Sequence, residues 1–270
     1  MGRLSITTAW NESADFLKRH FGALFTIAVA LITLPNVATQ WLAPLPVPPA
    51  AGAQAGLWLV LLVLVLLLNM VGSLAISSLA LGRENVVGDA LRHGVRRLPA
   101  MAGAAFILIA AALILFVPLV LATGVRPEHL IAPTPATAGR IGLVMLVFVL
   151  FGLFFAVRLM LLTPVAAAEG AGPVAIITRS WALTRGHFWK LLGFVLLITL
   201  AAMVAIGVAA MIVGLIVSLV AGPPEEGGLG QLILLLATSL LNAAFIVVMA
   251  TMVARIYLQL AGPPPAASGS

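Results

Sequence analysis

Three polar side chains interrupt long apolar runs of the sequence and are the first candidates for chemistry. They are Asn69, Arg158 and Asn242. An ionisable side chain inside a membrane marks a functional site by default, whereas a buried amide usually bonds to another helix. We therefore interpret the two asparagines as contacts between helices, with a substrate site as the alternative. Arg158 stands near the end of its apolar run, where its guanidinium can reach the lipid headgroups or pair with Glu169.

No other residues have the types and spacing that chemistry requires. The chain has no cysteine, and its four histidines are scattered and form no spaced pair with a carboxylate. Sequence motifs of serine hydrolases, phosphate-binding loops and zinc proteases are missing. The sequence therefore predicts no catalytic, cofactor-binding or metal-ligating residue, and we expect a protein that is not an enzyme.

Composition indicates that the surroundings of this chain are mostly lipid. Hydrophobic residues make up 63% of the sequence and charged residues only 8%, against about a quarter charged in soluble domains. The apolar runs are continuous, which favours helices over the alternating strands of a barrel. They predict one membrane domain, residues 1–261, followed by a disordered tail at 262–270. The six expected spans lie near residues 21–43, 57–82, 99–124, 141–165, 188–221 and 230–256.

Polar segments precede the first, third and fifth spans, near residues 5–20, 83–97 and 170–187. Each has apolar residues three or four apart beside a charged face, which is typical of a helix lying in the membrane interface. Trp181 and Phe188 belong to the apolar stripe of the third segment. The predicted fold is an all-α integral membrane protein whose six transmembrane helices form three hairpins, each preceded by a cytoplasmic amphipathic interfacial helix. We interpret the three units as divergent internal repeats, each with a basic hinge between its polar segment and its first span, at residues 18–20, 96–97 and 185–187.

The distribution of basic residues predicts the orientation. Twelve of the 14 lysines and arginines lie at the termini or in the two internal polar linkers. Only Arg126 and Arg140 lie in or directly beside the three short connections rich in Pro or Gly, Pro44–Gly56, Val125–Gly139 and Gly222–Gly230. Both termini are therefore expected in the cytoplasm, with the protein in a bacterial inner membrane. Because the charges sit at helix ends and form no single patch, we exclude nucleic acid as a partner. The candidate contacts with anionic lipid headgroups are Lys18, Arg19, Arg92, Arg96, Arg97, Arg179, Arg185 and Lys190.

Two stretches resemble a known family. One runs from Arg158 to Lys190 and reads RLMLLTPVAAAEGAGPVAIITRSWALTRGHFWK, and the other is Ala254–Leu260, ARIYLQL. Both are similar to the membrane domain associated with bacterial glycerophosphoryl diester phosphodiesterases. The resemblance implies the membrane part alone, because the catalytic barrel of that family needs well over 200 further residues.

Two functions remain open at the level of sequence. The first is a non-enzymatic scaffold or accessory module that contacts anionic lipid or a membrane-protein partner. The second is a small transporter or channel for a lipid-related or amphiphilic solute, with Asn69, Arg158 and Asn242 lining a path. A polar cavity that joins these three residues would favour transport, and a dry interior would favour the scaffold.

Overall fold

Every regular element in the described part of the chain is helical. The computed structural model describes residues 5–42, 53–84, 86–124, 134–221 and 228–262. The elements are α1 (Ile6–Ile27), the π-helix η1 (Ala28–Thr33), α2 (Leu34–Leu42), α3 (Ala53–Ala80), α4 (Val87–Ala122), α6 (Pro135–Leu159), α7 (Leu162–Ala168), α8 (Pro173–Thr184), α9 (Phe188–Ala221) and α10 (Leu229–Ala261). Six helical stretches are long and apolar enough to cross a membrane. The predicted all-α class with six transmembrane helices is confirmed.

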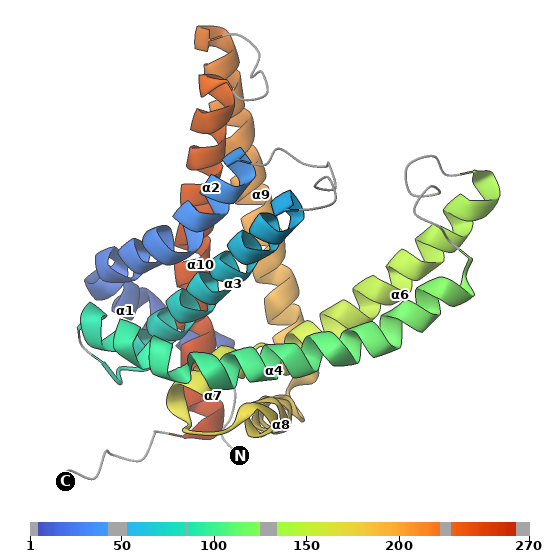
Figure 1. Ribbon diagram of the computed structural model, residues 1–270. Coiled ribbons are helices and arrows are strands. Elements are labelled where there is room, and N and C mark those ends of the chain that lie inside the picture. Colours follow the sequence, from blue (N-terminus) through green and yellow to red (C-terminus); the bar gives the residue numbers. More distant parts are fainter. Residues whose placement is uncertain (1–4, 43–52, 85, 125–133, 222–227, 263–270) are drawn as a thin grey trace.

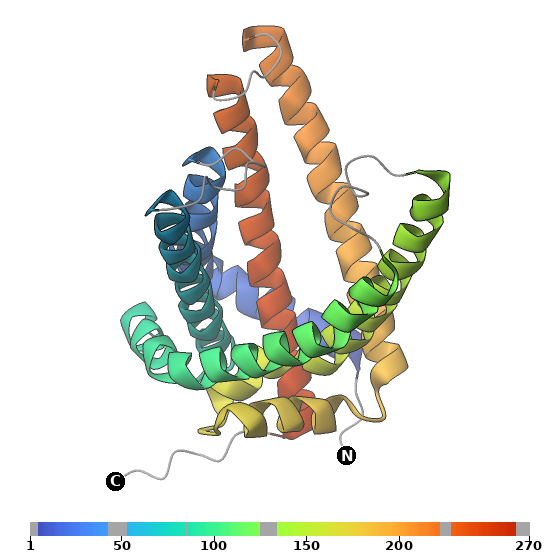
Figure 2. The ribbon, with the colours of Figure 1, turned by 45° about the vertical axis from the view of Figure 1, so that its right-hand side comes forward.

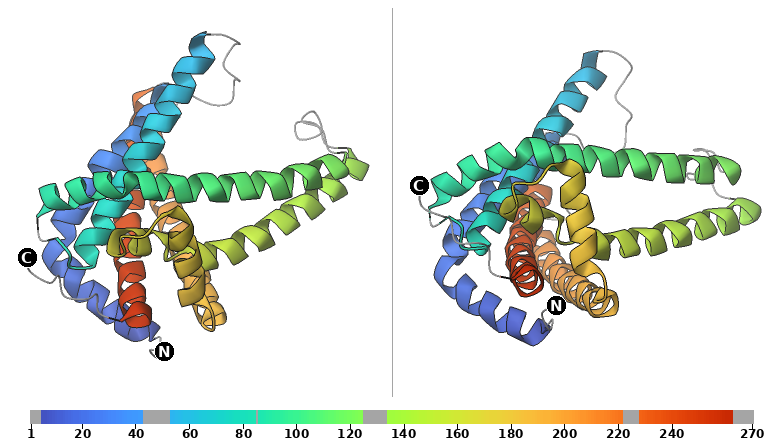
Figure 3. Two further views of the ribbon diagram at one scale, coloured as in Figure 1. Left: turned by 60° about the horizontal axis from the view of Figure 1, so that its bottom comes forward. Right: turned by 90° about the horizontal axis from the view of Figure 1, so that it is seen from below.

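The six long stretches form three hairpins that diverge from a common base (Figures 1 and 2). The first hairpin pairs α1, η1 and α2 with α3, the second pairs α4 with α6, and the third pairs α9 with α10. The base contains α7, α8 and the C-terminal end of α10. Figure 3 shows α4 and α6 meeting at their far ends and separating toward the base.

The expected interfacial segments differ in how they join their spans. The third is a separate helix, α8, and the chain turns into α9 at Gly186, whose φ of 90° favours glycine. The other two are continuous with the spans that follow, because α1 runs through the basic residues 18–20 and α4 runs through Pro99. Lysine, arginine and histidine are compatible with a helix, so a charge cluster alone does not end one. The hinges expected at 18–20 and 96–97 are therefore wrong.

The predicted spans agree best with the structure in the third hairpin, where α9 covers the predicted residues 188–221. The fourth span has the predicted length but lies about six residues earlier, because α6 spans Pro135–Leu159 and a turn at residues 160–161 precedes α7. The expected tail lies outside the described residues except for Gly262, as do most of the three short connections and Arg126.

Close helix packing is concentrated in the first hairpin and at the base. Leu24 and Ile27 of α1 pack with Ile76 of α3 and Val247 of α10 in one buried cluster. A second cluster surrounds α7, whose short apolar side chains let neighbouring helices approach from all sides. By contrast, only 6% of the most apolar stretch of α4 is buried, against 33% in α3. The second hairpin therefore presents most of its surface to lipid.

The π-helix in the first span has a local cause. Pro35 has no backbone N–H and its ring clashes with the carbonyl four residues earlier, so regular α-helical bonding cannot continue across it. The helix widens instead, and the Leu34 N–H bonds to the Val29 carbonyl five residues back. Insertions of this kind are frequent at functional sites.

Candidate functional site

Arg158 is enclosed by aromatic rings at the base. It lies in the last turn of α6, and its Cζ atom stands 5.4 Å from the ring centroid of Phe154, 5.2 Å from that of Trp181 and 5.4 Å from that of Phe188. The three rings come from α6, α8 and the start of α9, so the guanidinium joins three elements. Its Nε and Nη1 atoms are buried, and neither has a hydrogen-bond partner in the described residues. We name Arg158 and these three rings the arginine cage.

The expected pairing of Arg158 with Glu169 is wrong. The turn at residues 160–161 breaks the helical register that would have placed the two side chains on one face. Glu169 Oε1 instead accepts hydrogen bonds from Arg179 Nε at 3.0 Å and from the Tyr257 hydroxyl at 2.9 Å. This carboxylate therefore ties α8 and the segment after α7 to the end of α10. Sequence analysis missed Tyr257, although the only tyrosine in an apolar helix needs a partner for its hydroxyl.

The two asparagines are connected through Asn36. Asn69 Oδ1 of α3 accepts a hydrogen bond from Asn36 Nδ2 of α2 at 3.1 Å, which is the contact between helices that we expected of a buried amide. Asn242 of α10 lines a small pocket beside α2, and Asn36 lines the same pocket. Asn36 therefore links Asn69 to the pocket that Asn242 lines.

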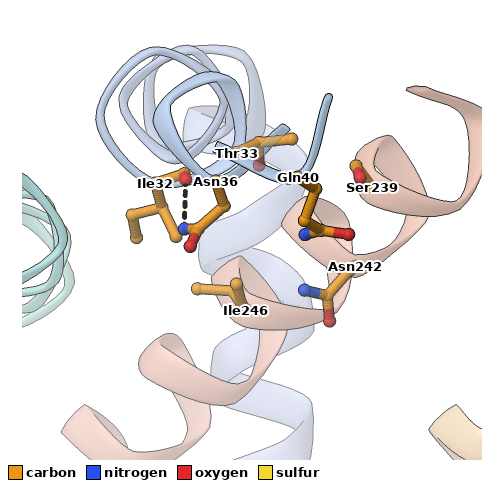
Figure 4. Close-up of a pocket in the computed structure, with 7 residues that line it drawn as sticks. All are labelled: Ile32, Thr33, Asn36, Gln40, Ser239, Asn242 and Ile246. Carbon is orange, nitrogen blue, oxygen red and sulfur yellow. Dashed lines mark hydrogen bonds between the residues drawn. The ribbon is translucent and has the colours of Figure 1, made fainter. Parts of the chain in front are cut away.

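The pocket beside Asn242 is rich in amides and has a volume of about 270 Å³. Its lining residues are Ile32, Thr33, Asn36, Gln40, Ser239, Asn242 and Ile246 (Figure 4). Within the described part of the chain, the side chains of Gln40 and Asn242 make no hydrogen bond. Neutral amides can bind water or a small uncharged polar solute, but they supply no acid, base or nucleophile. We name this the amide pocket.

Sequence analysis did not identify Asn36 and Gln40 as site residues. The sequence did contain an indication of them. Asn36 directly follows Pro35, and Gln40 lies four residues further on, where it shares one face of the helix with Asn36. Neither Asn69 nor Arg158 lines this pocket, so the pocket alone does not join the three residues of the transport hypothesis.

The eight candidate headgroup contacts lie on α1, the first turns of α4, α8 and the residues that lead into α9, all of them segments away from the hairpin tips (Figure 1). Seven are exposed, and the exception is Arg97, whose guanidinium lies against Gly170. Three of the eight have a carboxylate partner, in the pairs Lys18–Asp15, Arg92–Asp89 and Arg179–Glu169. The other five have no carboxylate within 4.0 Å among the described residues. They are Arg19, Arg96, Arg97, Arg185 and Lys190. In the described residues no three histidine or carboxylate side chains come together as a metal site would require.

These features define an all-helical polytopic membrane protein with a basic base and two small polar sites. The chain belongs to the family described as Domain of unknown function (DUF7847), whose model matches residues 17–260. No curated protein and no solved structure matches it. Nothing in these comparisons links the chain to the membrane domain of the phosphodiesterase family, so that resemblance stays a hypothesis.

Proposed function

We propose that this protein is a non-enzymatic scaffold or accessory module of the bacterial inner membrane, and that it binds anionic lipid through its base. The observation that carries the proposal is a set of exposed basic side chains on α1, the first turns of α4, α8 and the start of α9, at the end of the hairpins away from their tips. Four of these exposed side chains, Arg19, Arg96, Arg185 and Lys190, have no carboxylate partner among the described residues, so their charge is free to act on the membrane surface. Each basic residue near an anionic leaflet contributes on the order of 1 kcal/mol, screened by salt.

The proposal requires the base to face the cytoplasm, and labelling can test this orientation. In this Cys-free chain, single cysteines at Ala50 and Ala132 should react with a membrane-impermeant maleimide added to intact cells. Cysteines at the exposed positions Gly88 and Ala182 should react only after the cells are opened. Strong labelling of position 88 or 182 in intact cells would contradict the orientation and, with it, the cytoplasmic lipid contact.

Lipid binding itself can be tested by reversing charges that make no contact inside the protein. The double variant Arg19→Glu, Arg96→Glu alters two exposed, unpaired side chains at the base. At about 1 kcal/mol per residue, we expect the protein, reconstituted in nanodiscs, to retain phosphatidylglycerol at its surface roughly 30-fold more weakly. Retention of phosphatidylcholine should show little change, and the difference should shrink as salt is raised.

Arg140→Glu is the matched control, because Arg140 is exposed at the opposite end of the molecule, where it donates to the Thr123 carbonyl. An equal loss in the double variant and in Arg140→Glu would show that charge acts without regard to position. An equal loss in anionic and zwitterionic lipid would show that Arg19 and Arg96 act through protein contacts. Either result would overturn the proposed function.

The amide pocket supports a second candidate function, the passage of a small polar solute. It places five polar side chains at the first and third hairpins, beside a π-helix. If the pocket is part of an aqueous path, a cysteine replacing Ser239 should react with a small water-soluble thiol reagent in the native protein. Failure to react, with normal reaction after denaturation, would leave the scaffold as the better account.

A further inference from the structure

The arginine cage has hydrogen-bond donors without acceptors. Aromatic faces attract the guanidinium charge by the cation–π interaction, but the N–H groups of arginine point outward in its own plane. Nε and Nη1 are buried and have no acceptor among the described residues, and the nearby His187 Nδ1 is also buried without a partner. Glu169 is not the missing acceptor, because no ion pair within 4.0 Å joins it to Arg158 and its Oε1 atom accepts from Arg179 and Tyr257 instead. The cage therefore carries an uncompensated positive charge.

A large apolar groove begins beside the cage. It lies between α4 and α6 and has a volume of about 590 Å³. Its lining residues are Leu108, Ile109, Ala111, Ala112, Leu115, Phe116, Phe148, Gly152, Phe155 and Leu159. Leu159 directly follows Arg158, and the Phe155 ring lies 6.0 Å from the Trp181 ring of the cage. The groove and the cage thus share a wall.

The charge and the groove lie at depths that suit one amphiphilic molecule. Arg158 is at the end of a 25-residue helix, which at 1.5 Å per residue is long enough to cross the hydrocarbon core of about 30 Å. Its guanidinium therefore reaches the level of lipid phosphates, and the groove extends from there along the hydrocarbon region. Exposed Trp189 and Lys190 follow the cage residue Phe188, as expected at a headgroup boundary.

We infer that the arginine cage and the groove together bind one anionic phospholipid. The phosphate lies on the guanidinium of Arg158 and the acyl chains lie between α4 and α6. Arginine binds phosphate through paired N–H donors, which gives geometric specificity as well as charge. A zwitterionic headgroup fits less well, because its cation meets Arg158 and Lys190. This inference rests on the proposed function for the contact with anionic lipid, and it differs by assigning one site of high affinity.

Native mass spectrometry of the full-length protein in mild detergent tests the site. The probes are phosphatidylglycerol, phosphatidylcholine with the same chains, and glycerol phosphate, which lacks chains. For the unaltered protein we expect one phosphatidylglycerol adduct that survives high salt, at least tenfold tighter than phosphatidylcholine, and no tight adduct with glycerol phosphate. Arg158→Met should weaken that adduct about tenfold or more, and Arg158→Lys should weaken it less. Ala112→Trp, which fills the groove without changing charge, should also weaken it.

The controls separate a ligand site from a structural arginine and from the general lipid contact. Arg19→Met should leave the tight adduct unchanged, because Arg19 is exposed and outside the cage. Arg158→Met should keep its thermal stability in lipid-free detergent and lose only the rise in Tm that phosphatidylglycerol produces. An equal loss of Tm with and without lipid would show that Arg158 only holds helices together and would overturn the inference.

Other outcomes also decide the question. A tight adduct with glycerol phosphate would show that the groove takes no part, and an unchanged adduct in Arg158→Met would remove the cage from the site. Both would overturn the inference while leaving the weaker, salt-sensitive binding tested with Arg19→Glu, Arg96→Glu untouched. If Arg19→Glu, Arg96→Glu loses the weak, salt-sensitive binding but keeps the tight adduct, the proposed function is supported and the tight adduct belongs to a separate site.

Discussion

Gly94→Leu should abolish the packing of α4 on α3 and prevent the protein from accumulating in a folded form. A Cβ atom at Gly94 would stand 2.9 Å from the Val71 carbonyl oxygen and 3.5 Å from the Ala75 backbone nitrogen. Backbone atoms cannot turn aside as a flexible side chain can, so the two helices must separate. We expect Gly94→Ala to lower the free energy of unfolding by about 2–3 kcal/mol and Gly94→Leu by more than about 4 kcal/mol.

Gly88→Ala is the matched control for this prediction. Gly88 also lies in α4, and a Cβ atom there meets nothing within 4 Å. Its substitution should change stability by no more than about 0.5 kcal/mol. Thermal unfolding in a mild detergent, followed by the loss of monodisperse protein, measures all three variants. Similar stabilities for Gly94→Ala and Gly88→Ala would mean that α3 and α4 are not in contact at Val71.

Glu169→Ala should be the most harmful single change among the polar residues of the base. It leaves the hydroxyl of Tyr257, a residue only 4% exposed, without its acceptor, and it removes the partner of Arg179. A hydrogen bond to a charged group contributes about 1.5–3 kcal/mol. Because the carboxylate is partly exposed, we expect a loss at the lower end of the range for two such bonds, about 3 kcal/mol.

Tyr257→Phe provides the comparison. It removes one hydrogen bond and leaves the ring in place, so we expect a loss of about 1–2 kcal/mol. In the double variant Glu169→Ala, Tyr257→Phe the two losses should not add, because both changes delete the same bond. Full additivity would contradict the 2.9 Å contact between the Tyr257 hydroxyl and Glu169.

The number of spans and their helical class could be predicted from hydropathy. The places where the spans join the neighbouring helices could not. Long apolar runs indicate spans because backbone groups in lipid must be bonded within a helix. The junctions depend on where a helix breaks. Gly186 breaks one through its positive φ, whereas residues 18–20 contain nothing that stops a helix. Gly72 packs against Leu31 and Ile32, as small residues in spans often do.

The candidate site was predicted only in part, because its residues lie on helices that are far apart in the sequence. Arg158 was recognised as unusual, but its ring partners Trp181 and Phe188 were interpreted as a lipid-facing stripe. Only the folded chain shows that α8 and the start of α9 place these two rings against Arg158 at the end of α6. Arg158 does not pair with Glu169, because the two-residue turn at 160–161 changes the helical face on which every later residue lies. Long-range contacts of this kind depend on turns that periodicity does not resolve.

One feature of the base bears on how the protein is made. Ser5, at the start of α1, donates its backbone N–H to Gln259 Oε1 near the end of α10 at 3.1 Å, and Arg255 lies 5.0 Å above the Phe16 ring. α1 is synthesised before α10, so its packing partner lies far along the chain. During synthesis one face of α1 therefore stays uncovered until α10 has been inserted. Chains that end before α10 should consequently be recognised as incomplete and degraded by membrane quality-control proteases.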